Sequence, residues 1–284
     1  MLLLSWNIQW GRGLDGRVDL ARITDTIRSM GNFDVICLQE VARNFPGLPG
    51  SAGEDQMAQL AAGLPGYAPV YAPATDLPGN QGGRKQFGNA LFSRLPVGQV
   101  FRHQLAWPAD SSVPSMQRVL LEAVVAAPWG PVRVMTTHLE YYSPAIRAAQ
   151  VACIRSYHAQ ACAHAQAPRQ GKGEVGGPFE VLPRPASALL CGDMNFPEAS
   201  PERLLFLAEF DDGTPAWLDS WEVLHRGEPH APTVGIHSMD FVDRPSCYDF
   251  VFLTEDLAPR LVGHEVNAET TASDHQPVWV ELKD

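Results

Sequence analysis

No stretch of the 284-residue sequence has the roughly 18 consecutive apolar residues that a transmembrane helix requires. Residues 1–7 hold only a short apolar run with no basic segment before it, so we do not expect a signal peptide. Cysteine is scarce as well: there are five, an odd number, and no two form a C-x-x-C pair. This usage is typical of reduced thiols, and we expect a cytoplasmic protein without a membrane span.

Several catalytic signatures are also missing. The sequence has no Walker loop, no G-x-S-x-G nucleophile elbow and no Cys/His cluster of the zinc type. Positive charge is in short supply: 21 Lys and Arg stand against 32 Asp and Glu, which gives a net charge of −11. An acidic protein repels a phosphate backbone at long range, and this counts against non-specific binding of duplex DNA.

Short apolar runs alternate with amphipathic segments at the start of the chain. Residues 2–6 and 34–38 have the composition of buried strands, and between them apolar residues recur at helical spacing over 18–27. Later runs pair as hairpins, as in 119–125 with 132–137. Strands interleaved with helices and followed by hairpins predict an α/β fold of mixed sheets with helices outside.

Two segments interrupt this pattern. Residues 73–87 hold prolines and glycines and no apolar periodicity, which predicts a surface loop. Residues 166–187 are rich in Gly, Pro and charged residues, and a strand pattern resumes at 188. We therefore interpret 166–187 as a flexible insertion and expect a single domain over residues 1–284.

Polar side chains stand at the ends of the apolar strands. The run at 188–191 leads through Gly192 to Asp193 and Asn195, which face the same side of an extended chain because they are two residues apart. Further candidates end other apolar strands, namely Asn7, Glu40, His138 and the pair Asp274 and His275, and Asp249 lies near the start of its strand. Singly, each fits a turn, a helix cap or a hydrogen-bonded core histidine. If the strands are neighbours, these side chains converge on one site.

The combined set has the residue types that metal-assisted phosphoester hydrolysis needs. Magnesium prefers a few carboxylate oxygens and keeps several waters, so Glu40 and Asp274 are suitable ligands with Asn7 nearby. A carboxylate such as Asp193 can take a proton from the attacking water. Three groups can donate hydrogen bonds to the phosphoryl oxygens: His138, Asn195 and His275.

The candidate residues and their neighbours also match a known family in their order along the chain. The matching segments are Ser5-Trp6-Asn7, Leu38-Gln39-Glu40-Val41, Gly88-Asn89-Ala90-Leu91-Phe92-Ser93-Arg94, Thr137-His138-Leu139, Gly192-Asp193-Met194-Asn195, Tyr248-Asp249-Phe250-Val251-Phe252 and Ser273-Asp274-His275. Over residues 5–275 the chain resembles the endonuclease/exonuclease/phosphatase superfamily of deoxyribonuclease-like, metal-dependent phosphoesterases. The resemblance implies a four-layer α/β sandwich, in which two mixed β-sheets pack face to face with helices outside.

The resemblance also implies a role for each site residue. Glu40 binds the divalent metal, with Asn7 and Asp274 within reach; the metal is Mg²⁺, with Mn²⁺ as a substitute. Asp193 orients or deprotonates the attacking water, and Asn195 holds this water or a phosphate oxygen.

The phosphate-contacting residues follow from the same resemblance. His275 contacts the scissile phosphate and is held by Asp249, while His138 fills a second phosphate-contacting position. Arg118 is similar to a phosphate-facing arginine that several members carry. Where members often have a basic residue before the aspartate motif, this chain has Ser246-Cys247-Tyr248, a departure from the abasic-site endonuclease branch.

We therefore expect a magnesium-dependent hydrolase of phosphoester bonds, of the phosphodiesterase or phosphatase type. The acidic charge favours a small or lipid-like substrate over nucleic acid, and we expect a monomer. A nuclease that acts on DNA or RNA is the alternative. A catalytically inactive binding scaffold is a further alternative from another class.

Overall fold

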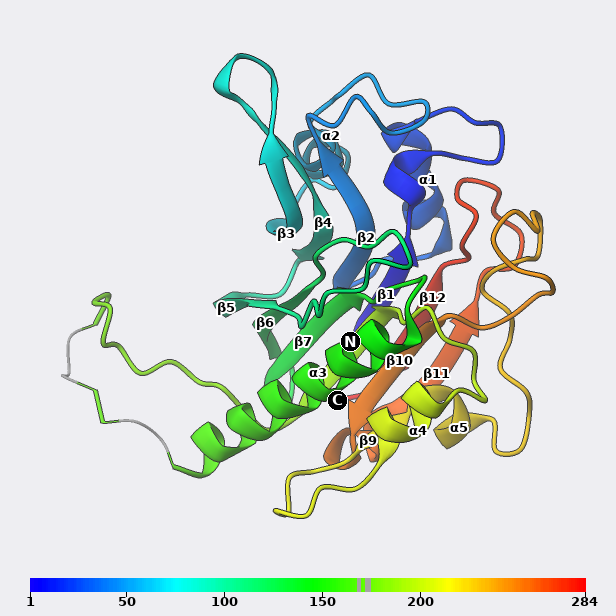
Figure 1. Cartoon of the computed structure of the whole chain (residues 1–284). Helices are drawn as coiled ribbons and strands as arrows, with labels where there is room; N and C mark the ends of the chain where they lie inside the picture. Colours follow the sequence, from blue (N-terminus) through cyan, green and yellow to red (C-terminus); the bar gives the residue numbers. More distant parts are fainter. Residues whose placement is uncertain (168–169, 172–174) are drawn as a thin grey trace.

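Two six-stranded sheets form the centre of the computed structural model, which describes residues 1–167, 170–171 and 175–284 (Figure 1). The strands of the first sheet are, in order, β11 (Leu261–Val266), β12 (Val278–Leu282), β1 (Leu2–Asn7), β2 (Val35–Arg43), β4 (Arg84–Ser93) and β3 (Ala68–Pro78). Those of the second are β5 (Val97–Gln104), β6 (Val119–Ala127), β7 (Gly130–His138), β8 (Ala188–Asp193), β10 (Asp249–Thr254) and β9 (Trp217–Asp219). The pairs β1–β2 and β7–β8 are parallel and the other pairs antiparallel, so both sheets are mixed.

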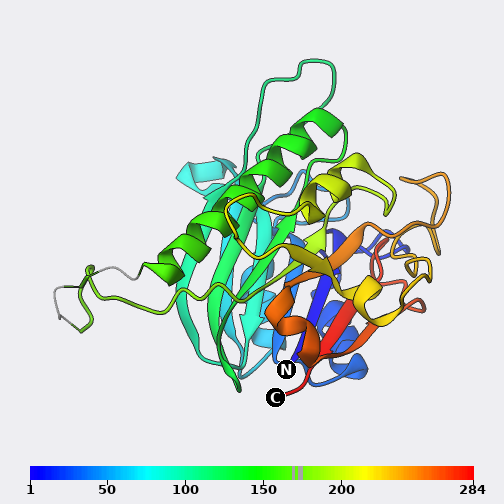
Figure 2. The same ribbon diagram turned by 90° about the horizontal axis from the view of Figure 1, so that it is seen from below.

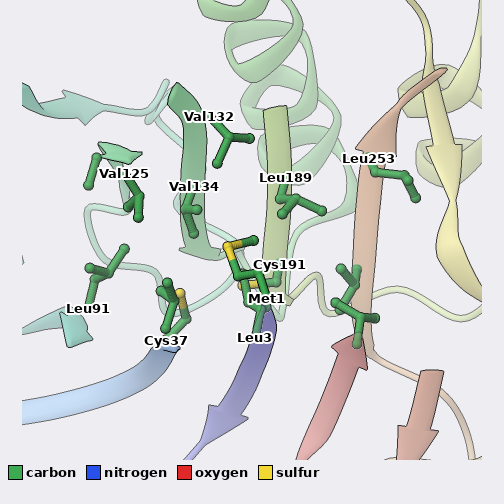
Figure 3. Close-up of a cluster of buried hydrophobic side chains, with 14 of the residues drawn as sticks. Met1, Leu3, Cys37, Leu91, Val125, Val132, Val134, Leu189, Cys191 and Leu253 are labelled. Carbon is green, nitrogen blue, oxygen red and sulfur yellow. The ribbon is translucent and has the colours of Figure 1, made fainter. Parts of the chain in front are cut away.

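An apolar core fills the space between the two sheets. It combines residues of the first sheet such as Leu3 and Cys37 with residues of the second such as Val134, Leu189 and Cys191 (Figure 3). These side chains are fully buried. Because each sheet covers the inner face of the other, removal of this apolar surface from water is a main source of stability.

Helices cover the outer face of each sheet. On the first sheet lie α1 (Leu20–Met30) and α2 (Gln56–Gly63), whose apolar residues form a second cluster with Leu4, Trp6 and Ile36. On the second lie α3 (Pro144–Gln166) and α4 (Pro201–Leu207) (Figure 2). Their apolar residues pack against Leu190 and Phe252. The layers are therefore helix, sheet, sheet and helix, which confirms the predicted four-layer α/β sandwich.

The remaining helices are short: η1 (Gln9–Gly11), η2 (Asn80–Gly82), α5 (Ser220–Leu224) and η3 (Glu255–Arg260). The main helices begin where the sequence provides a cap. Ser143 accepts a hydrogen bond from the Ile146 amide at the start of α3, and Ser200 accepts one from the Arg203 amide at the start of α4. In the described part of the chain, no helix is both long and apolar enough to cross a membrane.

The predicted surface loop at residues 73–87 is wrong, because most of this segment is a β-hairpin. Strand β3 continues to Pro78 and β4 starts at Arg84, so only the hairpin end is irregular (Figure 1). Proline suggested a loop because it cannot donate a backbone hydrogen bond. Strand β3, however, lies at the edge of its sheet, and the pairing shifts register between Pro73 and Thr75. An edge strand with a bulge tolerates proline.

The segment expected to be a flexible insertion, 166–187, is described only in part. Residues 168–169 and 172–174 lie outside the described residues. At its C-terminal end the segment is attached to the second sheet, because the Arg184 guanidinium bonds both carboxylate oxygens of Glu122 at 3.0 and 3.1 Å.

Candidate active site

The candidate residues extend the inner faces of four strands. Side chains alternate along a strand, so Asn7 points to the same side as Leu3, and Asp193 to the same side as Leu189 and Cys191, all of which lie between the sheets. By the same alternation His138 continues the side of Val132 and Val134, and Asp249 that of Val251 and Leu253. The apolar core therefore gives way to polar side chains at one edge of the sandwich.

Strand direction explains why Asp249 and His275 come from the starts of strands. Strand β10 is antiparallel to β8 and pairs Asp249 with Asp193, so its first residue meets the last residue of β8. The segment of Asp274 and His275 precedes β12, which is antiparallel to β1 and pairs Val278 with Ser5. The beginnings of these strands and the ends of β1 and β8 thus meet at the same edge.

Glu40 reaches the site through a β-bulge. Regular alternation would turn Glu40 away from the sheet interface, because Gln39 faces inward and bonds the Thr136 hydroxyl of the opposite sheet at 2.8 Å. The pairing of β2 with β4 shifts register between Leu38 and Val41, and Glu40 has a φ of 60°. A bulge redirects a side chain in this way.

Gly192 allows β7 and β8 to approach at the site. Its φ is 139°, and a Cβ at this position would lie 1.9 Å from the carbonyl oxygen of Thr137. The pairing that follows places His138 opposite Asp193. Only glycine fits this backbone conformation and this spacing.

One amide joins the two halves of the site. The Asn7 side chain donates to Glu40 Oε1 at 3.1 Å and to Asp193 Oδ2 at 3.0 Å. Its own Oδ1 accepts from the Gln9 amide at 3.0 Å. Glu40, from the first sheet, and Asp193, from the second, therefore open onto the same space.

Two of the carboxyl groups are poorly solvated. Burial, with a further contribution from the charge of Asp274, raises the pKa of Glu40 from 4.5 to about 7. Burial likewise raises the pKa of Asp193 from 3.8 to about 6. A positive charge in the space between them would stabilise the ionised form of each carboxyl group.

His275 is held as a cation by two aspartates. Its Nδ1 donates to Asp249 Oδ2 at 2.8 Å, and its Nε2 lies 3.5 Å from Asp193 Oδ2. Burial alone would lower its pKa, but the negative charges of Asp249 and Asp193 prevail and hold the pKa of His275 well above 6.5.

His138 lies on the other side of Asp193 and has the opposite charge state. Its Nε2 is 3.5 Å from Asp193 Oδ2, and its Nδ1 is 3.8 Å from Glu40 Oε1. Burial and the nearby Arg118 hold the pKa of His138 well below 6.5, which keeps the imidazole neutral. A neutral and a charged imidazole thus stand on either side of one carboxylate.

Arg118 and Asn195 complete the set of predicted residues. Arg118 is buried beside Glu140, whose Oε2 is 3.7 Å from its Nε; Nε and Nη1 have no hydrogen-bond partner among the described residues. Asn195, at a φ of 52°, donates from Nδ2 to the Leu139 carbonyl at 2.9 Å. The site therefore holds a buried cation with unused donors.

A cavity of about 320 Å³ opens over these groups. Seven of the nine predicted residues line it: Glu40, Arg118, His138, Asp193, Asn195, Asp274 and His275. The other two, Asn7 and Asp249, lie behind this layer and hold it through hydrogen bonds to Glu40, Asp193 and His275. The volume of the cavity suits one small organic ligand.

The residues present fit a divalent cation. Glu40 and Asp274 offer carboxylate oxygens, the donor type that Mg²⁺ and Mn²⁺ prefer, and burial together with the charge of Asp274 raises the pKa of Glu40. Asp193, Asp249 and His275 also lie close, with one ligand atom of each within 4.8 Å of the others. In that group, however, Asp249 Oδ2 already accepts hydrogen bonds from His275 and Thr233, which favours a hydrogen-bonded pair.

Two residues of the site were not among the sequence candidates. Gln9 donates to Asp274 Oδ2 at 2.7 Å, and Thr233 donates to Asp249 Oδ2 at 2.7 Å. Gln9 lies two residues after Asn7, so a search for polar residues just beyond each strand would have identified it. Thr233 lies in a segment without periodicity, and only the fold brings it to Asp249.

The chain is similar to known proteins in sequence and in fold. A family model described as the Endonuclease/Exonuclease/phosphatase family matches residues 4–275. An endonuclease/exonuclease/phosphatase structure from Beutenbergia cavernae has a TM-score of 0.69 and 25% identity, and the match covers 100% of this chain and 72% of that chain. A search among curated proteins found no match.

Two further solved structures are similar in fold and distant in sequence. A mannosyl-6-phosphatase from Bacteroides thetaiotaomicron has a TM-score of 0.67 and 17% identity, with 100% of both chains covered. A humanized D. rerio TDP2 has a TM-score of 0.61 and 17% identity, with 100% of this chain and 99% of that chain covered.

Proposed function

The chain belongs to the endonuclease/exonuclease/phosphatase family, whose members are hydrolases of phosphoesters, and we propose that it is a divalent-metal-dependent phosphodiesterase or phosphatase. The observation that supports this most is the bridge from Glu40 through Asn7 to Asp193, flanked by a neutral His138 and a cationic His275. It joins a metal-ligand carboxylate, a base and donors for a phosphate in one cavity.

We assign the metal to Glu40 and Asp274, with Asn7 beside them. When bound, Mg²⁺ or Mn²⁺ neutralises charge on the phosphoryl oxygens and so supplies electrostatic stabilisation of the transition state. Gln9 orients Asp274 through its 2.7 Å hydrogen bond.

The chain's own residues account for the proton and the phosphate. Asp193 accepts the proton of the attacking water, since its carboxylate faces the cavity. Its Oδ1 is held by a hydrogen bond from the backbone amide of Asn195. His275 donates from Nε2 to a phosphate oxygen, while Asp249 fixes its other nitrogen. His138 and Arg118 provide further donors to the developing charge.

The test is hydrolysis of bis(4-nitrophenyl) phosphate with Mg²⁺ or Mn²⁺. We expect activity that a chelator removes, and a loss on the order of a hundredfold or more in Asp193→Ala and in His275→Ala. Asp211→Ala, at an exposed position, is the matched control. Wild-type turnover in either site variant, with its fold intact by circular dichroism, would refute the role assigned to that residue.

The two alternatives are separated by simple measurements. An inactive scaffold would show no shift in thermal unfolding when Mn²⁺ is titrated, whereas a metal site that binds only the folded state raises the melting temperature. Nicking of plasmid DNA at a rate that falls steeply with salt would favour a nuclease.

The setting of the enzyme is part of the proposal. All five cysteines lie among the described residues and each is a free thiol, which supports a cytoplasmic protein. We propose a monomer that acts on a small or lipid-like phosphoester, because a net charge of −11 disfavours polyanions.

A further inference from the structure

One apolar wall of the cavity comes from the first sheet and its loops. It consists of Trp10, Phe45, Leu48 and Phe87, and we call it the first wall. Its rings form one cluster: Phe87 lies 6.5 Å from Trp10 and 6.4 Å from Phe45 between ring centroids. The indole nitrogen of Trp10 already donates to the Pro49 carbonyl at 2.9 Å. The first wall therefore offers the cavity mainly carbon.

A second wall comes from loops of the second sheet. It consists of Tyr141, Tyr142, Phe241 and Val242. The two tyrosine rings are 4.8 Å apart and nearly perpendicular, and the Tyr141 hydroxyl donates to the Phe241 carbonyl at 2.7 Å. That bond ties the loop before β10 to the loop after β7, so this wall is one connected surface.

Both walls border the same cavity as the polar groups of the site, and most of the cavity's lining is apolar. Tyr142 and Phe241 remain about half exposed, at 53% and 54%. Exposed large apolar side chains gathered at a binding cavity signal an apolar ligand group. Building on the function proposed above, we propose that the substrate is a phosphoester of an apolar alcohol, either alkyl or aryl, whose carbon group rests on these walls.

The same walls disfavour a sugar phosphate. A hexose beside the phosphate would place hydroxyls against carbon surface, and a buried hydroxyl without a hydrogen bond is costly. The Trp10 indole N–H and the Tyr141 hydroxyl proton are already used in hydrogen bonds within the protein. On this ground the chain differs in substrate class from the mannosyl-6-phosphatase of similar fold.

The experiment measures kcat/KM for a series of 4-nitrophenyl alkyl phosphodiesters that share one leaving group. From methyl through butyl to octyl, we expect kcat/KM to rise by up to about fourfold for each methylene that enters the cavity. Propyl and 2,3-dihydroxypropyl esters form a matched pair that differs only in two hydroxyls, and we expect the propyl ester to be favoured about tenfold. A phenyl ester compared with a hexyl ester distinguishes an aryl from an aliphatic source.

Variants of the second wall test whether this cavity causes the preference. Tyr142→Ser and Phe241→Ser should each lower the octyl-to-methyl ratio of kcat/KM several-fold, and their exposure limits the cost to stability. Leu204→Ser is the matched control: Leu204 is 68% exposed on α4 and does not line the cavity.

Other outcomes separate this inference from the proposed function. The inference is overturned if the methyl ester is hydrolysed but kcat/KM does not change with chain length, or if the dihydroxypropyl ester is favoured over the propyl ester. Either result leaves the proposed phosphoesterase activity intact. If no ester is hydrolysed, the proposed function fails, and calorimetric binding of octylphosphonate against methylphosphonate decides the inference. Tighter binding of the octyl compound with a negative heat-capacity change supports it, and equal binding overturns it.

Discussion

At the scale of single residues, the orientation of His275 depends on Thr233. Asp249 Oδ2 accepts one hydrogen bond from Thr233 at 2.7 Å and one from His275 at 2.8 Å, while Oδ1 has no partner among the described residues. The Thr233 hydroxyl also accepts from the amides of Tyr248 and Asp249. This hydroxyl therefore fixes both the carboxylate and the backbone that carries it.

We predict that Thr233→Val lowers kcat about ten- to a hundredfold, since a hydrogen bond to a charged group contributes roughly 1.5–3 kcal/mol. KM should change less, because Thr233 does not line the cavity. Thr233→Ser keeps the hydroxyl and should retain most of the activity. If the serine variant is as slow as the valine variant, the methyl group matters through packing and the positioning role is wrong.

A second residue-scale prediction concerns Gly192. Gly192→Ala should destabilise the fold by on the order of 3 kcal/mol or more, because it combines an unfavourable φ with a clash against the Thr137 carbonyl. Gly213→Ala is the control, since its φ is 77° but no atom lies within 4 Å of the added Cβ, and about 1 kcal/mol is expected. Urea denaturation measures both, and equal losses would show that the contact with β7 is not tight.

The sequence allowed the candidate residues to be found but not the residues that support them. Asn7, His138 and Asp193 were found because each ends an apolar run, and strand alternation places them on the core side. Thr233 was not found, because it precedes the site in a loop whose path depends on pairing with Ser246 and His275. Local patterns carry no information about such contacts.

At the scale of elements, the ends of strands were easier to predict than irregularities within them. The bulge that turns Glu40 into the site leaves no trace in the apolar pattern of β2, although the residue itself was a candidate. The prolines of β3 predict a loop where the structure has a hairpin with β4, because an edge strand needs no backbone hydrogen bonds on its outer side. Edge strands tolerate proline, which central strands exclude.

A buried ion pair on β6 leads to an element-scale prediction. Glu122 is fully buried, and although burial favours the neutral acid, its hydrogen bonds from His103 and Arg184 and the charge of Arg133 lower its pKa from 4.5 to about 2. A lowered pKa stabilises the folded state above pH 4.5, and this contribution is lost as the pH falls from 4.5 to about 2.

We therefore expect the wild-type protein to lose on the order of 3 kcal/mol of unfolding free energy from this group between pH 6 and pH 2, because folding lowers the pKa of Glu122 from 4.5 to about 2. Glu122→Gln should be less stable at pH 6 and lose less on acidification, whereas Glu255→Gln at an exposed site should follow the wild type. Urea titrations across this pH range give the comparison. Parallel curves for wild type and Glu122→Gln would contradict the prediction.

At the scale of the whole molecule, the resemblance of ordered sequence segments to a known family predicted the two-sheet architecture, which local strand and helix patterns could not. Strand and helix periodicity indicated mixed sheets but left their number open, because a strand's partner is fixed by contacts distant in the chain. The match of seven short segments to a family supplied the two-sheet arrangement, which the structure has. The site then follows from the fold, since the ends of β1, β7 and β8 and the starts of β10 and β12 meet at one edge.

We propose that the chain is a single domain, and the arrangement of its core gives a test. Neither sheet can leave its inner face exposed, so the two should unfold together. Trp6, packed in the outer layer of the first sheet, and Trp217, in that of the second, are both buried and report on opposite sides. Leu189→Ala, in β8 between the sheets, should cost about 2–5 kcal/mol.

With each of these tryptophans replaced in turn by phenylalanine, fluorescence and far-ultraviolet circular dichroism should give one urea midpoint, and Leu189→Ala should lower that midpoint equally for both probes. Leu204→Ala, on the exposed side of α4, should not measurably shift the urea midpoint reported by either probe. Separate midpoints, or a Leu189→Ala shift confined to the Trp217 side, would mean that the sheets unfold independently. Glu40 and Asp193 would then be joined across two cooperative units, and the site could open without global unfolding.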